Sequence, residues 1–236
     1  MVTRGLRWTV TGLMLVLGLA LAAPGTAEAR HGAGQGSEGL LRAFHNSPDT
    51  PAVDVWVDGE PALLNVAYGS LSEYLALPSG EHDIAIKVAP SSAGDPAALA
   101  ATVTVGRKPI TVAAIGSLAG QGAPLQAKVY VDGPRPWLGF FSRLRVAHTS
   151  PDAPPVDVQV KLFGDWITVI PGLAFGSSSG YLPLPALKYD FRVVLAGTDR
   201  VALELPGTQL PGGQALTVWA VNFAGELAPF VSLDGR

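Results

Sequence analysis

One stretch of this sequence occurs twice. Leu41-Arg-Ala-Phe-His-Asn-Ser-Pro-Asp-Thr-Pro-Ala-Val-Asp-Val-Trp-Val57 returns 103 positions later as Leu144-Arg-Val-Ala-His-Thr-Ser-Pro-Asp-Ala-Pro-Pro-Val-Asp-Val-Gln-Val160. The shared pattern is His-x-Ser-Pro-Asp-x-Pro-x-Val-Asp-Val-x-Val. Agreement at this many positions, with two prolines and two aspartates among them, indicates a duplicated unit. The fold must therefore accommodate the same unit twice.

Shorter matches follow the motif in the same order in both copies. They pair Ala67-Tyr-Gly69 with Ala174-Phe-Gly176, Tyr74-Leu75 with Tyr181-Leu182, Thr111-Val112 with Thr217-Val218, and Val131-Asp-Gly133 with Leu233-Asp-Gly235. The offset changes only between matched segments, which places insertions in loops. We expect domain 1 over residues 40–133, a proline and aromatic linker over 134–142, and domain 2 over 143–236. Trp137, Phe140 and Phe141 are too apolar for a free linker and are predicted to pack at the junction.

Apolar residues alternate along both units. Val53, Val55 and Val57 alternate with other residues, as do Ile84, Ile86 and Val88, which is the period of a β-strand. Residues 97–105 combine helix-favouring alanines with Thr and Val, and we expect a strand there. Twenty prolines and 28 glycines favour short strands and turns. The pattern predicts an all-β protein of two tandem β-sandwiches, immunoglobulin-like or transthyretin-like, with about seven strands each.

The N-terminus has the features of a secretory signal peptide. Arg4 and Arg7 precede an uncharged run, and Ala27-Glu-Ala29 supplies a small-x-small cleavage site. We expect a signal peptide over 1–29 and a flexible leader over 30–39; an uncleaved membrane anchor is the alternative. Cleavage leaves 14 basic and 18 acidic residues and no Cys. This balance favours neither nucleic acid nor an anionic membrane surface. We expect a secreted, extracytoplasmic protein without a membrane span in its mature chain.

The motif and the segments that follow it resemble a large family of bacterial secreted proteins, catalogued as a domain of unknown function. The resemblance rests on Ser-Pro-Asp-x-Pro-x-Val-Asp-Val, Asn-Val-x-Tyr-Gly, a Tyr-Leu pair and a Leu-Pro-x-Gly turn. It covers nearly the whole mature chain and implies a signal peptide and β-sandwich domains. It implies no activity. The second copy departs from the pattern where Lys161-Leu162 replaces the Asp58-Gly59 hairpin signal and Leu187 replaces the turn glycine Gly80.

The repeated motif contains the residue types of a hydrolytic triad, but triad members usually come from separate loops. We interpret the motif as structural, with each aspartate bonded to turn amides and each histidine to backbone groups at a strand end. We expect no catalytic residue, cofactor or metal. The structural residues are His45, Ser47, Pro48, Asp49, Pro51, Asp54, His148, Ser150, Pro151, Asp152, Pro154 and Asp157.

The sequence also contains candidates for a calcium site and for aromatic ligand contacts. Calcium would need six to eight oxygens, which Asp49, Asp54 and Asp58, with Asp152 and Asp157 in the copy, could supply only if their loops converged. Among the aromatic residues, Tyr74 and Tyr181 match across the units and are predicted to be structural. Trp56 and Trp166 are the better candidates for exposed ligand contacts.

The sequence leaves two classes of function open. The first is a non-catalytic binding or structural module of the cell envelope or extracellular matrix, whose partner is a protein or polysaccharide. The second is a hydrolase of envelope polymers with its site at the domain junction. If His45 and His148 lie in separate domains, each beside its own turn, the hydrolase hypothesis loses its candidate catalytic residues.

Overall fold

The computed structural model describes residues 37–235, so the predicted signal peptide and the first residues of the predicted leader lie outside the described residues. Gln35–Arg236 forms one compact unit. The described part contains one short 3-10 helix, Ala224–Glu226, and none of its helices is long and apolar enough to cross a membrane. Everything else of regular structure is β-strand, which confirms the predicted all-β class.

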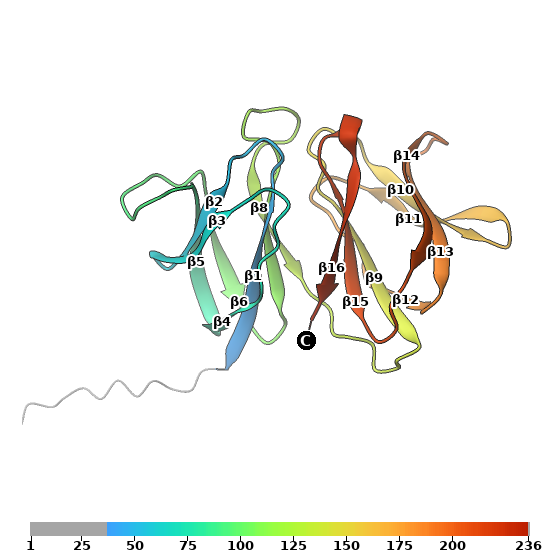
Figure 1. Ribbon diagram of the computed structural model, residues 1–236, viewed down its shortest axis with the longest axis horizontal. Helices are drawn as coiled ribbons and strands as arrows, with labels where there is room; N and C mark the ends of the chain where they lie inside the picture. The colour runs from blue at the N-terminus through green and yellow to red at the C-terminus, as the bar shows by residue number, and fades with distance from the viewer. Residues whose placement is uncertain (1–36, 236) are drawn as a thin grey trace, which may run out of the picture. The chain divides into compact units, whose positions relative to one another are not determined.

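The first half contains eight strands rather than the expected seven. They form two four-stranded sheets with the orders β4-β1-β7-β8 and β3-β2-β5-β6 (Figure 1). Strands β1 and β7 are parallel, and the other pairs are antiparallel. The strands are β1 (Glu38–Asn46), β2 (Val53–Val57), β3 (Glu60–Val66), β4 (Leu75–Pro78), β5 (Gly80–Val88), β6 (Leu99–Val105), β7 (Ile110–Ile115) and β8 (Gln126–Val131).

The second half repeats this topology strand for strand. Its sheets have the orders β12-β9-β15-β16 and β11-β10-β13-β14, with β9 and β15 parallel. The strands are β9 (Phe141–His148), β10 (Val156–Leu162), β11 (Asp165–Leu173), β12 (Leu182–Pro185), β13 (Lys188–Leu195), β14 (Val201–Gln209), β15 (Ala215–Val221) and β16 (Ala228–Asp234). The duplication read from the sequence is therefore a duplication of the fold, in two sandwich-like halves.

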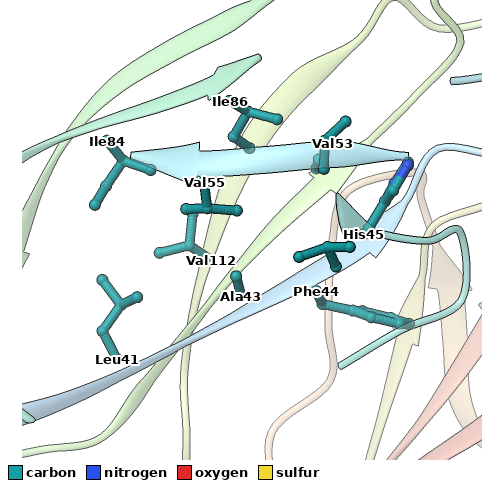
Figure 2. A pocket seen from close by; sticks show the side chains of 11 residues that line it. Leu41, Ala43, Phe44, His45, Val53, Val55, Ile84, Ile86 and Val112 are labelled. Atoms are coloured by element: carbon teal, nitrogen blue, oxygen red, sulfur yellow. The ribbon is translucent and has the colours of Figure 1, made fainter. Parts of the chain in front are cut away.

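Each half has an apolar core between its two sheets. In the first half, alternate residues of β1, β2, β5 and β7 meet there, among them Leu41, Val55 and Ile86 (Figure 2). The space left between these side chains is about 10 Å³, which is too small for a ligand. The valines of the motif therefore fill the core, as period-2 alternation requires.

The β10–β11 hairpin differs from its counterpart. Asp58 and Gly59 make the first turn with φ of 52° and 85°, and Phe163 and Gly164 make the second with φ of 54° and 100°. The second turn therefore has similar φ values to the first, but it lies two residues further along its copy of the repeat. A phenylalanine occupies the left-handed position, which Asp adopts more readily.

Candidate functional site

Each motif histidine lies at the end of a strand and bonds to its own turn. His45 Nε2 lies 2.9 Å from the Pro51 carbonyl oxygen, and His148 Nε2 lies 3.1 Å from that of Pro154. Both rings are buried, and burial lowers the pKa of His45 and of His148, although the carbonyl contacts oppose this. The two histidines thus lie in separate halves, each beside its own turn, which is the arrangement that the structural interpretation requires.

The motif serines do not use their histidines as bases. The Ser47 hydroxyl donates to the Gly116 carbonyl at 2.8 Å and contacts the Thr50 hydroxyl at 2.6 Å. The Ser150 hydroxyl is buried and has no partner among the described residues. Neither copy therefore forms the serine–histidine pair of a hydrolytic triad.

The first aspartate of the motif bonds to its own amide in the turn and also binds a neighbouring loop, which was not expected from the sequence. Asp49 accepts hydrogen bonds from the amides of Leu118 and Ala119 and from the Ser117 hydroxyl, at 2.6–2.9 Å. Burial opposes ionisation, but these donors outweigh it and hold the pKa of Asp49 below its usual value. In the copy, Asp152 accepts from the Ala224 amide at 2.7 Å. Each copy thus ties its turn to the loop before the last strand of its half.

The second aspartate joins two further loops. Asp54 is only 3% exposed, and its carboxylate accepts hydrogen bonds from the amides of Asn65 and Ser91, both at 2.7 Å. The Asn65 amide is the main reason that the pKa of Asp54 is lowered. Asp157 likewise accepts the amides of Gly172 and Gly197. The carboxylates considered for calcium do not converge, and residues 37–235 contain no group of three acidic or histidine side chains placed to hold a metal.

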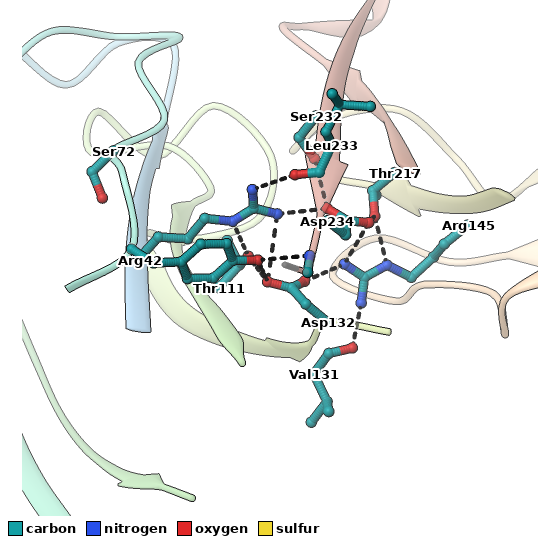
Figure 3. Close-up of polar contacts among 12 residues, drawn as sticks. Arg42, Ser72, Thr111, Val131, Asp132, Arg145, Thr217, Ser232, Leu233 and Asp234 are labelled. Carbon is teal, nitrogen blue, oxygen red and sulfur yellow. Dashed lines mark hydrogen bonds and ion pairs between the residues drawn. The ribbon is translucent and has the colours of Figure 1, made fainter. Parts of the chain in front are cut away.

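A buried polar cluster joins the two halves. Arg42, on β1, donates to the Asp234 carboxylate at 2.5 Å and to the Leu233 carbonyl at 2.7 Å, both at the end of β16. Arg145, on β9, donates to the Asp132 carboxylate at 2.7 Å and to the Val131 carbonyl at 2.8 Å, at the end of β8 (Figure 3). Each half thus supplies an arginine to the aspartate of the other, and we call these four charged residues the junction network.

Neutral residues at equivalent positions of the two halves bond to the aspartates of the junction network. The Thr111 and Tyr74 hydroxyls donate to Asp132, and the Thr217 and Tyr181 hydroxyls donate to Asp234. Burial raises the pKa of both tyrosines, so they remain protonated donors. The four charged side chains are at most 4% exposed and carry no net charge, which a buried ionic cluster requires. The same contacts occur in both directions, as in a two-fold dimer interface.

The apolar part of the junction is not symmetric. Phe44 from the first half packs on Trp219 and Phe230 from the second, with ring centroids 5.0 and 4.8 Å apart. The positions that match Phe44 and Trp219 in the other copy are Ala147 and Ala113, which belong to the same buried cluster. The aromatic rings therefore gather on one side of the pseudo-two-fold axis. The two copies therefore contribute side chains of different size to the junction.

Sequence reasoning missed the junction network. Val131-Asp-Gly133 served only as a match between the two copies, and Arg42 and Arg145 were not considered. A signal was present, because an arginine inside a strand and an Asp-Gly at a strand end recur in both copies. The expectation that Trp137 and Phe140 pack at the junction was wrong, since their side chains are 91% and 63% exposed.

A groove of about 620 Å³ lies beside the junction network. It is lined by the segment from Gly69 to Tyr74, by Arg135 and by β16. The hydrolase hypothesis places its site at the domain junction, where this groove lies. Neither motif histidine lines the groove, and the Ser72 hydroxyl that does so donates to the backbone carbonyl of Glu73.

The predicted exposure of Trp56 was wrong. Its side chain is 7% exposed, because the loop between β5 and β6 covers it. The indole Nε1 donates to the Ser91 hydroxyl at 2.9 Å, and the Lys87 ammonium lies 4.4 Å from the ring centroid. That ammonium also donates to the carbonyls of Ser92 and Ala93, which fixes the covering loop. Trp56 therefore has a structural place.

Trp166 has no such cover. The loop between β13 and β14 spans only residues 196–200, and Trp166 is half-buried on the outer face of its sheet. The Arg192 guanidinium lies 4.3 Å and the Lys161 ammonium 5.8 Å from its ring centroid. Arg192 Nε donates to Gln159, whose amide donates to Thr168. These five residues form a flat aromatic and cationic surface, which we call the tryptophan platform.

Comparison with known proteins identifies a family. The family model described as "Domain of unknown function (DUF4397)" matches residues 39–159 and 142–236. A search of curated proteins found no match.

Two solved structures are distantly similar. They are the Bacillus anthracis TIE protein, with 12% identity and a TM-score of 0.24, and a leucine-rich repeat protein from Bacteroides thetaiotaomicron VPI-5482, with 12% identity and a TM-score of 0.19. The matches cover 79% and 78% of this chain but only 34% and 26% of the two structures. Such low TM-scores do not bear on the fold.

Proposed function

We propose, from the premise that this chain belongs to the DUF4397 family of unknown function, that it is a non-catalytic binding module of the cell envelope or extracellular matrix. The proposed ligand is an acidic polysaccharide, and the proposed site is the tryptophan platform. An extracytoplasmic location rests on the predicted signal peptide alone.

One observation carries the proposal: two cations lie over the ring of the half-buried Trp166 and pair with no carboxylate among residues 37–235. An aromatic face can pack against the apolar face of a sugar ring. A guanidinium whose Nε is already fixed by Gln159 presents its remaining N–H groups to a carboxylate or phosphate with little loss of entropy. This combination suits a sugar polymer that carries acidic groups.

The two halves differ in this respect for a structural reason. In the first half, the loop over residues 89–98 occupies the outer face at Trp56, and Lys87 of β5 holds the loop in place. In the second half, the short turn leaves the corresponding face open. Ligand binding is therefore assigned to the second half.

A glycan array probed with the chain from Arg30 onward tests the proposal. We expect binding to acidic glycans, reduced at least tenfold by Trp166→Ala, because a large aromatic contact is lost. Arg192→Gln should remove the preference for acidic over neutral glycans. Phe163→Ala is the matched control, since it removes a fully exposed ring from the neighbouring hairpin and should leave binding unchanged.

Two results would count against the proposal. Undiminished glycan binding by Trp166→Ala would exclude the tryptophan platform as the site. Release of new reducing ends from a bound polymer would show that the protein is a hydrolase.

A further inference from the structure

A second surface lies at the linker end of the second half. Trp137, Phe140 and Leu187 are 91%, 63% and 59% exposed, although they are large and apolar. The Ala186 amide donates to the Phe140 carbonyl at 2.9 Å, so the linker and the β12–β13 turn lie together. In Figure 1, the connection from β8 to β9 runs along the lower end of the view. We call Trp137, Phe140 and Leu187 the apolar tip.

Three basic residues flank the apolar tip along the chain, although Arg135 also lines the groove beside the junction network together with Glu73. Arg135, Arg143 and Lys188 belong to the same two segments, and we call them the basic rim. No Asp or Glu occurs over residues 133–151 or 181–189. The flanking acids are already engaged: Asp132 lies in the junction network, and Asp190 accepts the Gly207 amide. This end of the protein is therefore locally cationic, although the whole chain has a net charge of −3.

The chemistry of these segments favours one occupant. Residues 133–141 and 182–188 contain no side-chain hydroxyl or amide group, and the neighbouring Ser142, Tyr189 and Gln209 side chains donate to backbone carbonyls. Recognition of a sugar polymer needs such groups to bind its hydroxyls. Exposed Trp, Phe and Leu beside Arg and Lys are instead the composition of a membrane–water interface.

The groove behind Trp137 fits the same partner. It measures about 290 Å³ and is lined by the linker residues Pro136, Trp137 and Leu138 together with Phe141, Arg143 and Pro183. Its single charged lining residue is Arg143, and the other lining side chains are apolar.

We propose that this end of the protein docks on an anionic phospholipid bilayer. The apolar tip inserts between the headgroups to a depth of about 5–10 Å, and the basic rim contacts the lipid phosphates. This surface is separate from the tryptophan platform, so the protein can bind a membrane and a polysaccharide by different faces. No membrane-spanning segment is required.

Vesicle binding tests this proposal. The chain from Arg30 onward is mixed with vesicles of phosphatidylcholine containing phosphatidylglycerol, and with phosphatidylcholine vesicles alone, and co-sedimentation is measured at low and high salt. We expect binding to the anionic vesicles that salt weakens, with a blue shift in tryptophan fluorescence. Neutralising each residue of the basic rim should weaken partitioning about fivefold. Replacing all three residues of the apolar tip by serine should abolish it.

Matched variants separate this docking from general adhesion. Phe163→Ala and Arg200→Gln remove an exposed ring and an exposed cation elsewhere and should leave vesicle binding unchanged. Trp137→Phe should retain binding but lose the fluorescence shift, because Trp56 and Trp219 are buried and Trp166 lies on another face. Absence of binding to anionic vesicles, or full binding by the triple serine variant, would overturn the proposal. Binding to dextran sulfate but not to vesicles would show that the partner is an anionic polymer.

Discussion

Replacing Arg42 by methionine would test the role of the junction network. Methionine preserves most of the length of the side chain but removes the guanidinium, with its bonds to Asp234 at 2.5 Å, to the Leu233 carbonyl at 2.7 Å and to the Thr111 hydroxyl at 2.8 Å. All of these groups lie at the contact between the two halves. The change therefore affects the contact between the halves without altering the core of either half.

The magnitude follows from what remains around Asp234. Breaking a buried ion pair by removing one partner costs about 3–5 kcal/mol, because the other charge stays buried. Asp234 keeps the Tyr181 hydroxyl at 2.8 Å, and Arg145 lies 3.7 Å away. These contacts compensate partly, so we expect a loss near the lower end, about 3 kcal/mol. Since folded domains are stable by only about 5–15 kcal/mol, the effect is large.

Urea unfolding followed by two signals measures the effect. Trp219 is fully buried at the junction, 5.0 Å from Phe44, so its fluorescence reports separation of the halves. Circular dichroism reports loss of the strands. We expect the two transitions to coincide in the original protein and the fluorescence transition to come first in Arg42→Met, because the halves then unfold less cooperatively.

A double-mutant cycle isolates the pair. Arg42→Met and Asp234→Asn together should cost at least 2 kcal/mol less than the sum of the single changes, whereas exposed pairs couple by only about 0–1 kcal/mol. The exposed Arg200→Met is the matched control and should change stability by less than about 0.5 kcal/mol. A loss of under about 1 kcal/mol for Arg42→Met, with coincident transitions, would refute the argument.

Three further outcomes follow from the structure. Gly133→Ala should destabilise the protein by about 1–3 kcal/mol in urea unfolding, because an added Cβ would lie 2.7 Å from the neighbouring tyrosine ring across the junction. Trp56→Ala should cost about 3–5 kcal/mol by the same measurement, since the ring is buried beneath its loop. The pKa values of His45 and His148 are lowered from 6.5 in the folded protein. The unfolded chain therefore binds protons first, and stability should fall as the pH of urea titrations drops below about 6.5.

Each of these outcomes has its own control. Gly106→Ala meets no atom within 4 Å and should be nearly neutral, so an equal loss at both glycines would contradict the junction argument. Trp166→Ala, at a half-buried position, should cost clearly less than Trp56→Ala. The pH series belongs in a His82→Gln background, because the contacts of His82 with Pro78 and Asp58 raise its pKa and stabilise the protein at low pH. Stability independent of pH between about 7.5 and 5.5 in that background would refute the prediction.

Local patterns predicted much of the fold. The period-2 valines of the motif lie in the core, and the ambiguous stretch before Val105 is a strand, as β-branched residues favour. The duplication itself predicted two equivalent halves. Each half has eight strands where about seven were expected, and the shortest, β4 and β12, are only four residues long and contain prolines, which weaken the strand signal.

Exposure and pairing were harder to predict, because both depend on residues distant in the chain. Trp56 was predicted to be exposed, but the loop that contains Ser91 covers it. Trp137 looked like a junction residue and is almost fully exposed. The bonding partners of Asp49 lie 69 and 70 positions away in another loop. No periodicity within one segment contains such information.

Alternation and repetition are properties of residues near one another in the chain, so they predict an all-β protein in which one unit is present twice. The way in which the second copy pairs with the first at the junction depends on the folded arrangement. Arg42 and Asp234 are 192 positions apart and form a pair only because two sheets pack face to face. A buried charge requires an opposite charge in space, at whatever distance along the chain, and the fold alone brings the two together.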